Sequence, residues 1–200
     1  MKKLLISLGV ILSVQSGYCQ VTEALDKTET RQKSKGHVKG NFYVMPGIGV
    51  GTNYGAKMVL PPLLINAEYG FHNMLSVGAM VGYGTAKESS TNWGVGSGHW
   101  RYNYFSLASR ASFHWGRYIR IPEELDLYGR VALGWRIRSS KWVEDVPTGR
   151  ADEPGKSADF GLIAGVHAGA KYMLTPALGA YLEIGHDNVS SVQLGVALKL

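Results

Sequence analysis

The sequence predicts an all-β protein, an eight-stranded antiparallel up-and-down transmembrane β-barrel. Three observations lead to this prediction. Segments that alternate apolar with small or polar residues recur eight times, and a period of two is that of a β-strand. No segment between them shows the 3.6-residue period of an amphipathic helix. Glycine accounts for 26 of the 200 residues, which disfavours helices.

The last strand shows the alternation most plainly. From Val192 to Leu200, every even position is a bulky aliphatic residue and every odd position is small or polar. The same pattern predicts strands at 41–50, 63–71, 75–84, 105–115, 125–138, 159–172, 178–185 and 192–200. Tight turns at 72–73 and 174–175 alternate with long links at 51–62, 85–99 and 139–157, and residues 116–124 and 186–189 complete the connections. Short turns on one side and long links on the other are typical of up-and-down barrels.

The N-terminus predicts export. Residues 1–19 combine a lysine-led start, an apolar run and a small-residue exit, which together indicate a secretory signal peptide cut after Cys19. Tyr18 fits a lipidation signal at Cys19 badly. The mature chain then has no cysteine and forms no disulfide. Residues 20–37 form a polar arm that we expect to be poorly ordered, and residues 38–200 form the barrel domain.

The charge and hydropathy limit the possible functions. The formal charge of +6 becomes +4 when Lys2 and Lys3 leave with the signal peptide, and such a mild excess does not indicate nucleic-acid binding. No stretch after the signal approaches the roughly 20 apolar residues of a membrane helix. A membrane span in this chain would therefore have to be a closed barrel.

Two barrel types differ in which face points inward. A soluble, lipocalin-like barrel would turn the apolar face toward a hydrophobic ligand, whereas an outer-membrane barrel turns it toward lipid. The polar face is rich in Gly, Ala and Ser, which suits a cramped interior. Outward aromatic residues near strand ends suit interfacial belts; they are Phe71, Trp115 and Tyr172 at the short turns and Tyr83 and Trp135 toward the long links. We favour the membrane barrel and keep the soluble barrel as the alternative.

The charges on the polar face have both signs and lie on neighbouring strands. Buried charges require partners, so we predict a paired network inside the barrel. In it Asp126 lies near Arg110 and Arg130, and Glu183 lies between Lys171 and Lys199. The predicted interior polar residues are Glu68, Arg110, His114, Asp126, Arg130, Arg136, His167, Lys171, Glu183 and Lys199.

Short motifs spread over residues 38–200 carry a resemblance to a known family. They are Lys39-Gly40-Asn41-Phe42, Ala67-Glu68-Tyr69-Gly70, Ser76-Val77-Gly78, Arg110-Ala111-Ser112-Phe113-His114-Trp115, Leu127-Tyr128-Gly129 and the ending from Glu183-Ile184-Gly185 to Leu200. In these the chain resembles the small eight-stranded outer-membrane β-barrels of the OmpA-like type, as in Bacteroidetes envelopes. The resemblance implies a Gram-negative outer-membrane location, contact with lipopolysaccharide and insertion by the outer-membrane assembly machinery. Such barrels usually end in an aromatic residue, whereas this one ends in Leu200.

Catalytic and cofactor sites find little support in the sequence. The glycine runs lack Gly-x-Gly-x-x-Gly spacing, the histidines lack zinc spacing, and we predict no cofactor or metal. His186, Ser190 and Glu183 suggest the triad of barrel enzymes that modify lipid A. By strand parity, however, His186 faces outward and Glu183 faces inward, so a lipid A-modifying enzyme is the weaker alternative.

The expected protein is therefore non-enzymatic, with a plugged, charge-paired, porin-like barrel and externally presented links. Eight strands leave an interior just wide enough for side chains, so we expect no wide pore. Trp93, Trp100 and Trp142 suit interface anchors better than ligand contacts. The sequence does not identify what the links bind.

Overall fold

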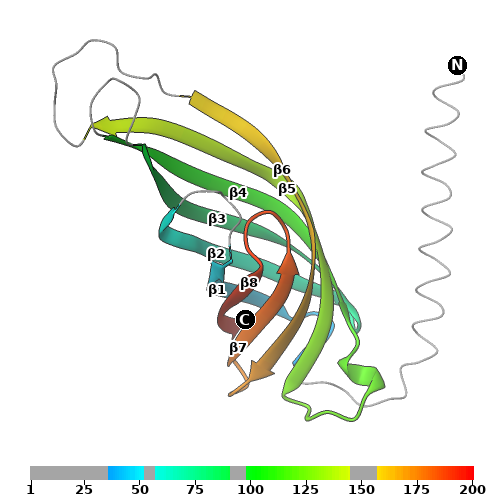
Figure 1. The fold of residues 1–200 in the computed structure, drawn as a ribbon. Helices are drawn as coiled ribbons and strands as arrows, with labels where there is room; N and C mark the ends of the chain where they lie inside the picture. The colour runs from blue at the N-terminus through cyan, green and yellow to red at the C-terminus, as the bar shows by residue number, and fades with distance from the viewer. Residues whose placement is uncertain (1–35, 52–56, 91–97, 145–156) are drawn as a thin grey trace, which may run out of the picture. The chain divides into compact units, whose positions relative to one another are not determined.

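The structure is a computed structural model, and it describes residues 36–51, 57–90, 98–144 and 157–200. Eight antiparallel strands form one closed barrel in sequence order (Figure 1). The strands are β1 Phe42–Val50, β2 Lys57–His72, β3 Leu75–Ser90, β4 Gly98–His114, β5 Leu125–Glu144, β6 Ser157–Met173, β7 Leu178–His186 and β8 Val192–Lys199. The 3-10 turn η1, Gly116–Tyr118, lies between β4 and β5. No helix in these described ranges is long and apolar enough to span a membrane.

The barrel closes through its first and last strands. Strand β1 pairs with β2 on one side and with β8 on the other, and the β1–β8 register runs from Tyr43 opposite Lys199 to Val50 opposite Val192. This pairing leaves neither terminal strand as a free sheet edge. The predicted eight-stranded, antiparallel, up-and-down barrel is confirmed.

The strand pleat places apolar and polar side chains on opposite sides of the wall. Leu133 and Trp135 on β5 are 62% and 65% exposed on the outside, whereas Lys171 and Glu183 inside are 0% exposed. Large apolar residues thus cover the outer wall, while six charged residues of the strands are enclosed: Glu68, Arg110, Asp126, Arg130, Lys171 and Glu183. This arrangement contradicts the lipocalin-like alternative, in which the apolar face would point inward.

Four strands extend further toward the long links than their apolar alternation indicated. Pairing between β3, β4, β5 and β6 continues to Ser90, Gly98, Glu144 and Ser157, inside the predicted links 85–99 and 139–157. Backbone pairing needs no apolar pattern, so it runs on where the side chains become polar on both faces. Strand β2 also begins early, at Lys57, and its register with β3 shifts around Pro61 and Pro62, since proline cannot donate to the sheet.

The β7–β8 turn folds into the barrel. Asp187 Oδ1 accepts hydrogen bonds from the backbone N–H groups of Val189 and Ser190 at 2.9 and 3.0 Å, and Asn188 adopts a left-handed φ of 63°, which asparagine tolerates. Asp187, Val189 and Ser190 are all buried. The predicted turn at 186–189 is present and also plugs the link side of the interior.

Several predictions fall wholly or partly outside the described residues. The signal peptide, residues 1–19, and Trp93 lie outside them, as does residue range 20–35 of the predicted arm. The arm's last residues, Gly36 and His37, are buried rather than loose. The backbone N–H of Gly36 donates to the carbonyl of Glu123 at 3.1 Å, and His37 is held inside the short-turn end of the barrel.

Candidate functional site

Two carboxylates and two guanidinium groups form the centre of the interior, which we call the central cluster: Glu68, Arg110, Arg130 and Glu183. Arg110 Nη2 lies 2.8 Å from Glu183 Oε2, and Arg130 bonds both Glu183 and Glu68. The four groups carry equal numbers of positive and negative charges, and all are nearly inaccessible to solvent. Such pairing offsets the desolvation that buried charges would otherwise suffer.

Neutral side chains complete the central cluster. The hydroxyl of Tyr128 donates to Glu183 Oε1 at 2.9 Å, and Arg130 Nε donates to Ser112 Oγ at 2.7 Å. Tyr128 reaches Glu183 by lying across Gly169 on β6, where a Cβ atom would stand 2.4 Å from the tyrosine ring. Glycine at this position therefore makes room for a hydrogen bond that links β5 with β7.

A second group lies at the short-turn end, the histidine cluster of His37, His114, Asp126 and Lys171. His114 Nδ1 lies 2.9 Å from Asp126 Oδ2, and Lys171 Nζ lies 3.2 Å from the same oxygen. Lys171 Nζ also stands 3.7 Å from the centre of the Tyr43 ring, a cation–π contact. The histidine cluster thus places one lysine and one aspartate together, with two imidazoles beside them.

The two clusters are continuous. Ser76 Oγ lies 2.8 Å from Glu68 Oε1 and 2.9 Å from His114 Nε2. The His37 ring stacks on that of His114, with 3.6 Å between centroids and 6° between planes. Burial, followed by the neighbouring His114, lowers the pKa of His37 from 6.5 to about 3. His37, which precedes β1, is therefore neutral at pH 7.

Two apolar layers pack beside the charges inside the barrel. Toward the long links, one layer joins side chains from five parts of the chain: Leu64, Met80, Ala108, Ile163 and Val189. The other layer joins side chains of β1, β6, β7 and β8: Tyr43, Met45, Met173, Tyr181 and Ala197. The described interior is therefore filled by packed side chains.

The structure places eight of the ten predicted interior residues in this buried interior, all except Arg136 and Lys199. Both exceptions are partly exposed. Arg136 donates to the carbonyl of Asn188 near the β7–β8 turn. No ion pair reaches Lys199 in the described part of the chain. His167 lies farther from its acid than the others, with Nε2 3.8 Å from Asp187 Oδ2.

The predicted pairings within the network differ from those observed. Asp126 pairs with His114 and Lys171 instead of the two arginines, and Glu183 pairs with Arg110 and Arg130 instead of the two lysines. The sequence prediction assigned partners by strand proximity alone. Arginine side chains are long enough to cross the interior, so Arg110 on β4 meets Glu183 on β7.

Sequence reasoning missed several interior residues. His37 precedes the first strand, where no alternation indicates a face. Asp187 is in a turn, and its burial depends on the turn folding inward. Asn66 and Gln193 do lie at inward positions of the alternation, and they bond Arg110, so strand parity could have found them.

A metal or catalytic role finds little support in the geometry. His37, Glu68 and His114 offer ligand atoms within 4.8 Å of one another, but the two rings are stacked, so their in-plane lone pairs do not converge on one ion. His186 Nε2 lies 2.8 Å from Asn188 Oδ1 on the exposed side, while Glu183 and Ser190 are buried. The three residues of the suggested lipid A triad therefore lie on different sides of the wall.

Aromatic side chains occur near both ends of the outer wall. At the short-turn end, Trp115 is 38% exposed and Tyr172 is 46% exposed. Toward the long links, Tyr83 is 45% exposed. Trp142, predicted to anchor at the interface, is instead 5% exposed. Its ring meets Trp100 edge-on, with 5.5 Å between centroids. Trp142 occupies an even position of β5, which is the inward face there.

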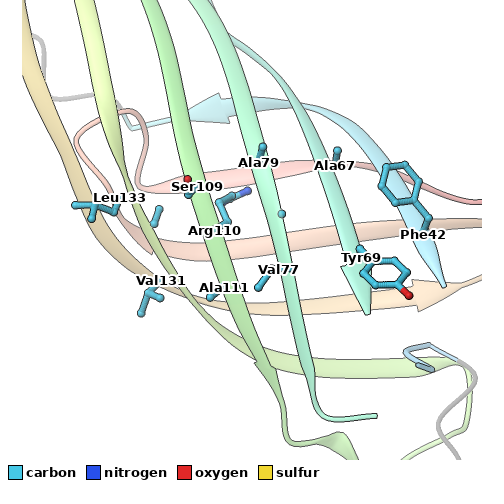
Figure 2. A pocket seen from close by; sticks show the side chains of 12 residues that line it. Phe42, Ala67, Tyr69, Val77, Ala79, Ser109, Arg110, Ala111, Val131 and Leu133 are labelled. Carbon is cyan, nitrogen blue, oxygen red and sulfur yellow. The ribbon is translucent and has the colours of Figure 1, made fainter. Parts of the chain in front are cut away.

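A depression of about 700 Å³ interrupts the outer wall across β2 to β5. Figure 2 shows that short side chains form its floor while larger ones stand beside it. Ala67, Ala79 and Ser109 are directly paired across three strands, between Tyr69 on one side and Leu133 on the other. The depression is a feature of the apolar wall and contains no cluster of polar groups.

Several solved structures are similar to the chain at low identity. They include the N-terminal β-barrel domain of Pseudomonas aeruginosa OprF (14% identity, 81% of this chain and 98% of that chain, TM-score 0.46). For the outer membrane protein OprG from the same organism, the match covers 83% of this chain and 98% of that chain at 14% identity, with a TM-score of 0.49. For Ail, the attachment invasion locus protein of Yersinia pestis, the match covers 81% of this chain and 96% of that chain at 15% identity, with a TM-score of 0.42. No family model and no curated protein matches the sequence. We therefore take the fold from the strand pairing and take no function from these neighbours.

Proposed function

We propose that this chain is a non-enzymatic integral outer-membrane protein with a closed, charge-paired interior and links presented to the outside. The observation that carries the proposal is the inverted sidedness of the barrel. Leucine, valine and aromatic side chains cover its outside, and ten aspartate, glutamate, lysine, arginine and histidine side chains are enclosed. A water-soluble protein would expose no such continuous apolar surface, whereas lipid favours it.

The backbone also suits a membrane. In the hydrocarbon region every N–H and C=O group needs a partner within the protein, and a closed barrel supplies them. Pairing of β1 with β8 removes both free edges over the height that these strands cover. Strands of 8 to 20 residues include the roughly 9–11 residues that a tilted spanning strand needs.

The finer assignments belong to the same proposal. The lysine-led signal peptide and the motifs of residues 38–200 support an OmpA-like barrel of a Gram-negative, Bacteroidetes-type envelope. Its partners would be outer-membrane lipids, including lipopolysaccharide, and the assembly machinery during insertion. The buried ion pairs would stabilise the barrel rather than react.

Membrane fractionation combined with gel mobility tests the proposal. We expect the protein in the outer-membrane fraction, with a compact band in unheated samples that shifts to its full apparent mass after boiling. A folded barrel in detergent resists unfolding until heated, which explains the shift. A soluble protein whose gel mobility does not change on boiling would contradict the proposal.

A further inference from the structure

Four positive side chains form one row across the outer wall near the long links, which we call the cationic row. Lys57 on β2 is directly opposite Lys87 on β3, Lys87 is opposite Arg101 on β4, and Arg101 is opposite Lys141 on β5. All four side chains are exposed. Neighbouring strands are about 4.8 Å apart, so four like charges stand side by side.

Such a row is unfavourable by itself. Like charges directly opposite on adjacent strands destabilise a sheet. Within the described residues, no carboxylate forms an ion pair with any of the four cations. Arg138, which faces the other side of β5, does pair with Asp159. Among the residues that the structure describes, the cationic row therefore lacks the compensation found elsewhere in the barrel, and an external anion would supply it.

The rows below the cationic row change in character step by step. Two residues nearer the short turns lie Thr85, Asn103 and Ser139, which are polar and neutral. Two residues further lies a mostly aromatic row: Tyr83, Phe105, Ile137 and Phe160. Four residues span about 13 Å along a strand, or roughly 10 Å along the axis of a tilted barrel. If the aromatic row marks the edge of the hydrocarbon, the cationic row lies at the level of lipid headgroups.

The cationic row also borders a recess of about 700 Å³ in the same wall. Lys57, Lys87 and Arg101 line it together with the apolar side chains of Val59 and Leu60. Tyr83 of the aromatic row also lines it. The recess therefore combines positive charge with apolar and aromatic side chains, which matches a molecule with a phosphate head and a hydrocarbon tail.

We propose that the cationic row binds the phosphate groups of a phosphorylated lipid headgroup in the leaflet on the long-link side of the barrel. The inference rests on the proposed membrane location, because only a membrane brings the headgroup to this height. Lysine and arginine bind phosphate through charge-assisted hydrogen bonds, and cations near a membrane surface attract anionic lipid. Diphosphoryl lipid A, a component of lipopolysaccharide, is the appropriate probe.

The test compares two double variants with the same loss of charge. Lys87→Gln with Arg101→Gln removes the centre of the cationic row, and Lys39→Gln with Arg120→Gln removes two exposed cations at the short-turn end. Binding of diphosphoryl lipid A and of its dephosphorylated form is measured on each refolded barrel by native mass spectrometry. We expect the first variant to weaken binding of the diphosphoryl form at least tenfold and the second to change it less than twofold.

Other outcomes would overturn the inference. Equal losses in both variants would show an effect of net charge, and equal affinity for the two lipids would show that phosphate is not recognised. If the first variant lost binding of a soluble polyanion such as heparin while its lipid binding stayed unchanged, the cationic row would be assigned to a soluble partner. The shift in gel mobility on boiling reports whether each variant has folded. If the Lys87→Gln, Arg101→Gln variant misfolds, Lys57→Gln with Lys141→Gln is used in its place. A wild-type barrel that fails to insert into vesicles would refute the proposed function instead.

Discussion

Glu183 is the residue on which the interior charges depend most, because it accepts hydrogen bonds from Arg110, Arg130 and Tyr128. Glu183→Gln would leave two buried guanidinium groups with a single remaining carboxylate. Removing one partner of a buried ion pair costs about 3–5 kcal/mol. We expect a loss of roughly 3 kcal/mol in the free energy of unfolding, measured by urea titration in detergent micelles.

Lys199→Gln is the matched control for that prediction. Lys199 is partly exposed at the end of β8, and exposed charges contribute at most about 1 kcal/mol. A loss in Lys199→Gln as large as that in Glu183→Gln would contradict the importance that we assign to the central cluster. It would restore the predicted partnership of Glu183 with Lys199.

His37 makes stability depend on pH. Its pKa of about 3 in the folded barrel lies below the ordinary 6.5, so the unfolded chain takes up a proton between these values that the folded chain refuses. The stabilisation is complete above pH 6.5 and falls as the pH drops, by at most about 1.4 kcal/mol per pH unit. His37→Asn removes this dependence.

We expect the wild type to lose up to about 2 kcal/mol more than His37→Asn between pH 7.5 and pH 5, measured by urea unfolding at each pH. The charged or titratable groups around His37, which are Glu68, His114, Asp126 and Lys171, are present in both proteins, so the difference isolates His37. Parallel losses in the two proteins would show that His37 is exposed to solvent in the folded state.

At the scale of the strand, β5 offers a direct test of sidedness. Leu133 lies on the outer face among apolar residues, and Ser139 lies on the same face beyond the aromatic row. Lysine at the bilayer midplane costs about 2–4 kcal/mol, but only about 0–1 kcal/mol near the interface. Leu133→Lys should therefore lower the folded fraction in lipid vesicles far more than Ser139→Lys.

Equal tolerance of the two lysine substitutions would place Leu133 outside the bilayer. Val196 and Ala197, neighbours on β8 that face opposite sides of the wall, form a less informative pair. Ala197 is 0% exposed within the apolar layer formed with Tyr43 and Met45. A charge there would be buried without a partner, so both positions would be sensitive for different reasons.

At the scale of the whole molecule, the filled interior predicts no open pore. The ion pairs pack beside two apolar layers, and the β7–β8 turn packs Val189 into one of them. We expect no steady conductance when the purified barrel is inserted into planar lipid bilayers. A stable conductance that persists after alanine substitution of Arg130 and Arg136 would contradict a plugged interior.

Strand number, strand order and sidedness could be predicted from the sequence. The pleat sends alternate side chains to opposite faces, so the apolar stripe from Val192 to Leu200 and the inward parity of Glu68, Arg130 and Lys171 follow from local geometry alone. The link-side ends of β3 to β6 could not be predicted from the sequence, because backbone pairing continues where the apolar alternation stops.

Partners inside the barrel were decided by tertiary structure. Which acid meets which base depends on barrel closure, on side-chain length and on space such as that above Gly169. The alternation therefore identified Glu183 as inward but could not pair it with Arg110 and Arg130. The burial of His37 and Asp187 likewise requires the barrel around them, because neither residue lies in a strand. Local periodicity determines the face of a residue, and only closure of the sheet brings distant faces together.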